Sequence, residues 1–173
     1  MSFIACQFDS EAAEILTIFN HAILNTTALY EYQPRTMATM QLWFQNKAAG
    51  NFPVIGLRNA AGQLVAFGSY GTFRAFPAFK YSVEHSVYVH PEHQGMGYGS
   101  QILAELIAAA TAQQYHLLIG GIDAENSGSI ALHQKYGFVH SGTISQAGFK
   151  FGRWLHLAFY QLTLATPKTP VDG

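Results

Sequence analysis

The chain has 173 residues, of which 49% are hydrophobic, and its formal net charge is -1 at pH 7. This length suits one domain that buries a core without disulfides or metals to staple it. We find no run of about 18 apolar residues that would cross a membrane, and no Lys/Arg run of the kind that binds nucleic acid. The N-terminus lacks a secretory pattern and Cys6 is the single cysteine. We therefore expect a cytoplasmic protein that binds a small ligand.

Helix patterns with recognisable ends occur in the first part of the chain. Residues 9–23 carry apolar residues at helical spacing after an acidic, cap-competent start at Asp9. A second helix is predicted after Thr36, which is also a capping residue, and Gly50 would end it. Two further helices are predicted later in the chain, and these would end near residues 114 and 136.

Strand patterns alternate with these helices. The predicted strands cover residues 2–6, 52–58, 64–73, 82–89, 116–122, 138–144 and 153–164. Mixed elements in this order indicate an α/β or α+β sheet with helices packed on its faces. We expect one domain over residues 1–164 and a flexible tail over residues 165–173.

The stretch HSVYVHPEHQGMGYGSQILAELI places Gly95, Gly97 and Gly99 between a strand pattern and a helix pattern. A helix start offers unpaired N–H groups and the positive end of a dipole, and glycine lets a ligand approach closely, so this join predicts an anion site. A tight turn is the alternative. A P-loop is excluded because no Gly-Lys-Ser/Thr follows, and the dinucleotide fingerprint would need a glycine where Ser100 stands.

The loop resembles the pyrophosphate-binding signature of the GNAT superfamily of N-acetyltransferases, Gln/Arg-x-x-Gly-x-Gly/Ala, here as Gln94, Gly97 and Gly99. The blocks NHAILNTTALYEYQPRT, TFRAF, VEHSVYV, DAENSGSIALHQKYGF and GFKFGRW are similar to those of the phosphinothricin acetyltransferase family, including its methionine sulfoximine and methionine sulfone acetyltransferases. The resemblance covers about residues 3–164. It implies a GNAT fold: a mixed, mostly antiparallel sheet that is splayed at the cofactor strand, with helices on both faces. It also implies acetyl-coenzyme A as co-substrate and a homodimer.

Cofactor contacts follow from this resemblance together with the chemistry of a helix start. The pyrophosphate would meet the N–H groups of residues 95–100, and the main chain of residues 87–89 would pair with the pantetheine arm. Asn126 and Lys135 match cofactor contacts of the family, although Asn126 is also an ordinary helix cap. The predicted cofactor-binding residues are Val87, Tyr88, Val89, Gln94, Gly95, Met96, Gly97, Tyr98, Gly99, Ser100, Asn126 and Lys135.

Acetyl transfer to an amine requires a base for the amine and a proton for the departing thiolate. Glu84, just before the cofactor strand segment, is the leading candidate base, and a solvated or ion-paired strand residue is the alternative. His85 alternates to the other sheet face. His133 matches a histidine of the family and is a second candidate base, although helix histidines more often pack. Tyr136 stands where many GNAT enzymes carry a proton-donating tyrosine, which some relatives lack.

The block TFRAF sets Arg74 among aromatic residues, where it could hold an α-carboxylate by a bidentate pair. Stacking on a neighbouring ring is the alternative. With the resemblance, this favours a small zwitterionic amino acid such as methionine sulfoximine, methionine sulfone or phosphinothricin, acetylated on its α-amine. Lys150 and Arg153 would add contacts, including contacts across a dimer. The predicted substrate-binding residues are Tyr30, Arg74, Ala75, Phe76, Val83, Glu84 and His85.

Other functions stay open on the sequence alone. The protein could acetylate a protein N-terminus or an aminoglycoside, or bind acetyl-coenzyme A as a regulator without turnover. Acidic clefts suit cationic substrates, whereas the pocket blocks here carry Arg74 with aromatic residues. No metal is expected, because Pro91 separates His90 from His93 and neither a cysteine nor a pair of carboxylates completes a site.

Overall fold

The computed structural model describes residues 1–172, so Gly173, the last residue of the predicted tail, lies outside the described residues. Within them, seven strands form a sheet in the order β1-β2-β3-β4-β5-β7-β6. The strands are β1 (Ser2–Ala5), β2 (Val54–Arg58), β3 (Leu64–Thr72), β4 (Ser82–Val89), β5 (Leu117–Asp123), β6 (Val139–Lys150) and β7 (Arg153–Thr163). The helices are α1 (Phe8–Asn25), α2 (Met37–Ala49), α3 (Tyr98–Ala112) and α4 (Ser127–Lys135), with short 3-10 turns η1 (Pro77–Phe79) and η2 (Pro91–His93).

The sheet is mixed and mostly antiparallel, which confirms the predicted architecture. Strand pairs β1–β2, β2–β3, β5–β7 and β6–β7 are antiparallel. β4 and β5 are parallel, with residues 82–85 opposite residues 117–120. Parallel pairing needs a crossover connection, and α3 supplies it between these two strands.

The chain divides into two compact units. The first unit consists of residues 1–71 and 86–106, and the second consists of residues 72–85 together with the chain from residue 107 onward. β4 supplies residues to both, because the boundary falls between His85 and Ser86. The expectation of a single domain over residues 1–164 stays a prediction.

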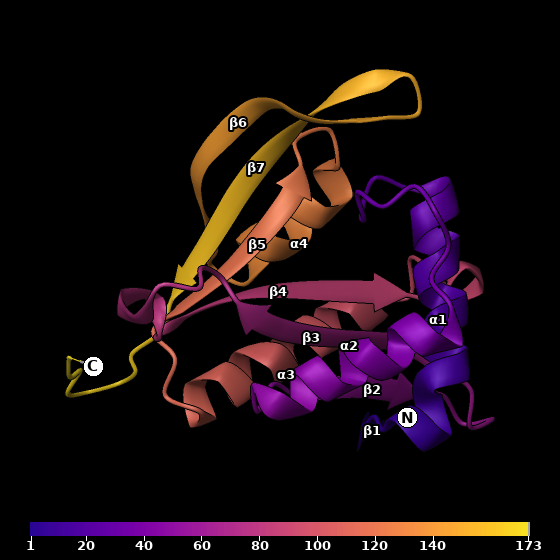
Figure 1. Cartoon of the computed structure of the whole chain (residues 1–173), viewed down its shortest axis with the longest axis horizontal. Helices are drawn as coiled ribbons and strands as arrows, with labels where there is room; N and C mark the ends of the chain where they lie inside the picture. The colour runs from indigo at the N-terminus through magenta and orange to yellow at the C-terminus, as the bar shows by residue number, and fades with distance from the viewer. Residues whose placement is uncertain (173) are drawn as a thin grey trace. The chain divides into compact units, whose positions relative to one another are not determined.

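In the first unit, helices cover both faces of the strands (Figure 1). Buried residues of α1, α2, β2 and β3 form one cluster, in which Phe19 and Phe67 meet edge to face with ring centroids 4.9 Å apart. Gly68, the next residue of β3, faces the other way. A Cβ atom at this position would lie 2.6 Å from Ile102 and 2.8 Å from Leu106 of α3. The missing side chain therefore lets α3 pack close to the sheet.

α2 begins and ends where the sequence predicts. The Thr36 hydroxyl accepts the Thr39 N–H at 3.3 Å, and the Thr39 hydroxyl accepts the Thr36 N–H at 2.9 Å. This reciprocal pair satisfies two N–H groups at the helix start, and Gly50 is the C-cap residue. None of the helices in residues 1–172 is long and apolar enough to cross a membrane.

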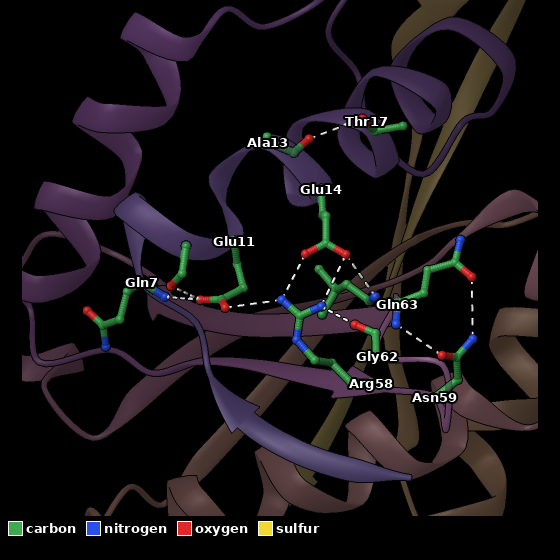
Figure 2. A network of polar contacts seen from close by, with 11 residues as sticks. Gln7, Glu11, Ala13, Glu14, Thr17, Arg58, Asn59, Gly62 and Gln63 are labelled. Atoms are coloured by element: carbon green, nitrogen blue, oxygen red, sulfur yellow. Dashed lines mark hydrogen bonds and ion pairs between the residues drawn. The ribbon is translucent and has the colours of Figure 1, made fainter.

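The predicted cap of the first helix was wrong, because α1 begins one residue before Asp9. Gln7 is the N-cap residue without a side-chain cap, and Glu11 reaches back to accept the Gln7 N–H at 2.8 Å. Figure 2 shows that Glu11 and Glu14 both face the guanidinium of Arg58 on β2, at distances of 3.2 and 2.8 Å. A tertiary partner on the sheet therefore sets the conformation of this helix start.

In the second unit, β6 and β7 form a long hairpin (Figure 1). β6 runs to Lys150, whereas the sequence pattern predicted a strand that ends at residue 144. Its register with β7 shifts between Ile144 and Gly148, and Gln146 has a φ of 54°. Such irregularities break the alternation of side chains, and this is why the pattern does not reveal the second half of the strand.

The described tail residues make hydrogen bonds within the same unit. The Val171 N–H donates to the Tyr81 hydroxyl at 3.1 Å, and the Thr166 hydroxyl donates to the Tyr115 carbonyl. These contacts bring part of the tail against the ends of other elements of the unit. Flexibility over residues 165–173 stays a prediction.

Candidate active site

The glycine loop of the first unit has the backbone that the sequence indicates. Gly95 and Gly97 have φ values of 77° and 78°, which L side chains rarely adopt, and a Cβ atom at either position would meet nothing within 4 Å. α3 starts at Tyr98, so Gly99 belongs to its first turn. Backbone N–H groups of a first turn lack partners within their own helix. The loop therefore offers an open approach to a helix start, which fits an anionic group such as a pyrophosphate.

Two histidines next to this loop, His90 and His93, make hydrogen bonds with other residues of the protein. His93 lies 2.9 Å from the Gln63 side-chain oxygen, and the His90 ring accepts the Glu92 N–H at 3.3 Å. Met96 at the tip of the loop is 58% exposed. Across residues 1–172, no cluster of three or more His, Cys, Asp or Glu side chains could hold a metal ion.

The predicted cofactor segment of residues 87–89 forms the second half of β4. Tyr88 points into the core, where its ring stacks on Phe67 at 5.2 Å and meets Phe19 at 5.0 Å. Val87 and Val89 are half-buried. Because Tyr88 is committed to packing, this segment can contribute main-chain groups to a ligand while its central side chain anchors the strand.

Glu84 is half-buried on the first half of β4, in the second unit. Its Oε1 atom lies 3.0 Å from the position that a Cβ of Gly121 would occupy. Burial raises the pKa of the Glu84 carboxyl above its ordinary value, and the positive charge of Arg74 acts in the opposite direction. A partly desolvated carboxylate with a raised pKa can accept a proton from an amine.

His85 and His133 meet on the opposite face of the sheet from Glu84. Their Nε2 atoms are 2.9 Å apart, and His133 Nδ1 lies 2.7 Å from the Ser129 carbonyl oxygen. Burial and the neighbouring His133 lower the pKa of His85 to about 3, and burial also lowers the pKa of His133. Both ring nitrogens of His133 have protein partners, so the geometry favours packing over proton transfer for this residue.

The predicted substrate arginine lies in an exposed segment of the second unit. The Arg74 guanidinium sits 4.6 Å from the centre of the Phe73 ring and donates to the Phe73 carbonyl at 3.3 Å. This is the stacked arrangement that the sequence left open as an alternative. Ala75 and Phe76 are also exposed, while Val83 on β4 is buried. Tyr30, in the first unit, is 38% exposed.

α4 carries the remaining predicted residues. Asn126 caps the helix, because its side-chain oxygen accepts the Ser129 N–H at 3.0 Å. Lys135 is the last helical residue, and its ammonium lies 6.0 Å from the ring centre of Tyr136, the C-cap residue. The structural alternative for Asn126 is therefore realised, and a contact with a ligand would come in addition to it.

Two features of the second unit escaped the sequence analysis. Arg153 pairs with buried Asp123 at 2.6 Å and with Glu125 at 3.3 Å, and its contact with a substrate or a second subunit stays a prediction. Gly121 lies directly beside Glu84. Its signal in the sequence was the pair of adjacent glycines inside a predicted buried strand, which is an unusual place for glycine.

Comparisons with known proteins agree with the motifs. The chain matches the acetyltransferase (GNAT) family over residues 17–138. It is 44% identical over 150 residues to an L-methionine sulfoximine/L-methionine sulfone acetyltransferase of Pseudomonas aeruginosa PAO1. The matched region covers 87% of each of the two chains.

Solved structures lead to the same family. A proposed acetyltransferase from Acinetobacter baylyi ADP1 is 56% identical, with a TM-score of 0.98 over 99% of this chain and 96% of that one. A GNAT superfamily phosphinothricin acetyltransferase from Sinorhizobium meliloti, solved in complex with acetyl-coenzyme A, is 31% identical, with a TM-score of 0.93 over 98% of this chain and 91% of that one. The protein is therefore a member of the acetyltransferase (GNAT) family.

Proposed function

We propose that this protein transfers the acetyl group of acetyl-coenzyme A to the α-amino group of a small amino acid such as methionine sulfoximine, methionine sulfone or phosphinothricin. The observation that carries the proposal is the open glycine loop at the start of α3, where Gly95 and Gly97 have positive φ values and a Cβ atom would meet nothing within 4 Å. The half-buried carboxylate of Glu84 suits an amine proton, and the exposed guanidinium of Arg74 suits a carboxylate. The relatives from Pseudomonas aeruginosa and Sinorhizobium meliloti support these substrates by what they are named for.

The cofactor would be held by the groups that the sequence indicated. The N–H groups of residues 95–100 would bind the pyrophosphate, the main chain of residues 87–89 would pair with the pantetheine arm, and Asn126 and Lys135 would add contacts. When bound, acetyl-coenzyme A supplies an activated acyl thioester. No metal takes part in this proposal.

The side chains of the protein have distinct tasks in the reaction. Glu84 accepts the proton of the substrate ammonium, directly or through a water, so that the amine becomes nucleophilic. Arg74 moves out of its stacked position to bind the substrate carboxylate, with Phe76 of the same unit as a neighbouring apolar side chain. Tyr136 holds a proton for the departing sulfur. His133 contributes to the packing behind β4.

We also propose that the protein acts in the cytoplasm as a homodimer, where it inactivates toxic amino acid analogues. The hairpin of β6 and β7 supports a second copy as partner, because large apolar side chains are exposed along it. These residues are Val139, Ile144, Phe149, Phe151 and Trp154. We expect light scattering to give a single molar mass twice that of the chain. The Trp154→Glu variant should give a lower molar mass.

The proposed function is tested by thiol release with a panel of amines under one set of conditions. We expect the free amino acids to be the best substrates. Their methyl esters should lose roughly 10- to 150-fold in kcat/KM, because a charge-assisted hydrogen-bonded pair contributes about 1.5–3 kcal/mol. Preference for an aminoglycoside or a peptide N-terminus would overturn the substrate. Cofactor binding without thiol release from any amine would favour a regulator.

A further inference from the structure

Two adjacent glycines occupy the middle of β5, which lies between β4 and β7 in the sheet. Gly120 pairs with His85 of β4, and Gly121 pairs with Phe159 of β7. Glycine weakens the interior of a strand because it adds no packing and loses more backbone entropy, so its presence there indicates that another group approaches closely. The question is which group occupies the space on each face.

Each glycine makes room for a different side chain. A Cβ atom on Gly121 would lie 3.0 Å from Glu84 Oε1, 3.2 Å from Leu157 Cδ1 and 3.7 Å from Phe159 Cε1. On the other face of the strand, a Cβ atom on Gly120 would meet the histidine pair, at 3.1 Å from His85 and 3.2 Å from His133. A side chain at position 121 would therefore press against the carboxylate of Glu84, which would have to move by a few tenths of an ångström.

We infer that Gly121 is a positioning residue for Glu84, because its bare backbone provides the slot in which the carboxylate rests. Leu157 and Phe159 of β7 form the apolar wall of this slot. A glutamate has three rotatable side-chain bonds, and the space beside Gly121 allows the arrangement in which the carboxylate lies against the bare backbone of β5. This inference rests on the proposed role of Glu84 as the base.

The structure also supplies a matched control. Gly120→Ala makes the same chemical change in the next residue of the same strand, with contacts almost as tight, but it presses on the histidine pair and not on Glu84. A general distortion of β5 should affect both variants alike. An effect through the base should appear in Gly121→Ala alone.

We expect Gly121→Ala to lower kcat roughly 5- to 10-fold, because the added Cβ atom would displace the carboxylate by a few tenths of an ångström and a displacement of about 1 Å costs roughly 100-fold. The KM for acetyl-coenzyme A should stay within about twofold of the wild-type value, since the cofactor loop is untouched. Gly120→Ala should keep kcat within about threefold of wild type. Equal losses in the two variants, or an unchanged kcat in Gly121→Ala, would overturn the inference.

A second set of variants tests the contact itself. In a Glu84→Asp background the shorter carboxylate no longer reaches the added Cβ atom, so adding Gly121→Ala should change kcat by less than about threefold. In a Glu84→Ala background the same addition should lower the midpoint of thermal unfolding less than it does in wild type, because only the contact with Leu157 at 3.2 Å remains tight, and this measurement needs no activity. A full additional loss in both backgrounds would contradict a role through Glu84, even if the single Gly121→Ala variant does not fold.

Failure of the proposed function gives a different result. If Glu84→Gln keeps its turnover, the base is misassigned and the inference falls with it. If Glu84→Gln loses turnover while Gly121→Ala keeps it, the proposed function stands and only the positioning role of Gly121 is refuted.

Discussion

At the scale of single residues, two opposing effects act on the pKa of the Glu84 carboxyl. Burial raises the pKa of its carboxyl, and the Arg74 guanidinium acts to lower it. In the proposed reaction, Arg74 would bind the carboxylate of the substrate and would also favour the ionised form of Glu84, the proposed base.

Replacing Arg74 by glutamine should move the acid limb of the kcat/KM profile to higher pH. The variant removes a positive charge that favours the ionised carboxylate, so the pKa of Glu84 rises further above its ordinary value. The measurement is a pH series of kcat/KM with one amino acid substrate. Lys80→Gln is the control, because it removes a positive charge stacked on Tyr81. Acid limbs that coincide in wild type and Arg74→Gln would contradict the interaction.

Gly97→Ala should weaken cofactor binding out of proportion to its effect on stability. The φ of 78° strains any L residue by about 1 kcal/mol, and the added methyl group would stand in the open space through which the proposed cofactor approaches the loop. Gly62→Ala is a matched control, because Gly62 has a φ of 82° and open surroundings in the turn between β2 and β3. Both variants should lose similar stability in urea, while only Gly97→Ala raises the KM for acetyl-coenzyme A. Equal KM values would argue against the loop as the binding site.

At the scale of elements, one guanidinium joins α1 to the sheet (Figure 2). Arg58 on β2 pairs with Glu11 and Glu14 of α1, and it donates to the Gly62 carbonyl in the following turn. Burial raises the pKa of Glu11, but hydrogen bonds from Ser10, Gln7 and Arg58 outweigh it, so this pKa lies below the ordinary value of 4.5. The ionised form of Glu11 therefore stabilises the fold.

Arg58→Met should lower the free energy of unfolding by about 1–3 kcal/mol at pH 7, because it leaves two partly buried carboxylates without their partner. A group with a lowered pKa stabilises the fold above its ordinary pKa and loses this effect as the pH falls through its folded value. The difference between wild type and variant should therefore narrow below pH 4.5. Urea unfolding at pH 7 and pH 3 measures this difference, with Glu31→Gln as the control because it removes a carboxylate from a different, partly buried pair with Arg35. An equal difference at both pH values would refute the linkage.

The buried pair of His85 and His133 makes the free energy of unfolding of the whole molecule depend on pH. The folded chain holds His85 neutral down to about pH 3, whereas the unfolded chain protonates it below its ordinary pKa of 6.5. The unfolded state therefore binds more protons, and stability rises with pH across this window.

We expect the free energy of unfolding to fall as the pH is lowered from 6.5 toward 3, by about 1.4 kcal/mol per pH unit for each proton taken up. His85→Gln keeps a hydrogen-bonding group but removes one titrating site, so its dependence on pH should be shallower. His140→Gln, which replaces an exposed histidine, should follow wild type. Denaturant titrations at half-unit intervals of pH provide the comparison, and parallel curves for His85→Gln and wild type would contradict the assignment.

The sequence by itself determined the order and type of the elements and the loop that carries the family signature. Thr36 and Gly50 mark the ends of α2 because capping and helix termination depend on local hydrogen bonds and backbone freedom. The same holds for Gly95 and Gly97, whose positive φ values follow from a tight join between a strand and a helix. Alternation along β4 also placed Glu84 and His85 on opposite faces, as the neighbours of Gly121 and Gly120 confirm.

Only the tertiary structure decided what each of these residues touches. Alternation gives the face of a side chain but not the element that covers it, so the contact between His85 and His133 and the slot beside Gly121 could not be read from the pattern. The start of α1 follows Arg58, a partner that lies 47 positions away from Glu11. β6 continues to Lys150 because its partner β7 supplies hydrogen bonds across an irregular register. Contacts between residues distant in sequence, rather than local propensity, settle these features, because each gains its stability from a surface that forms only when the chain folds.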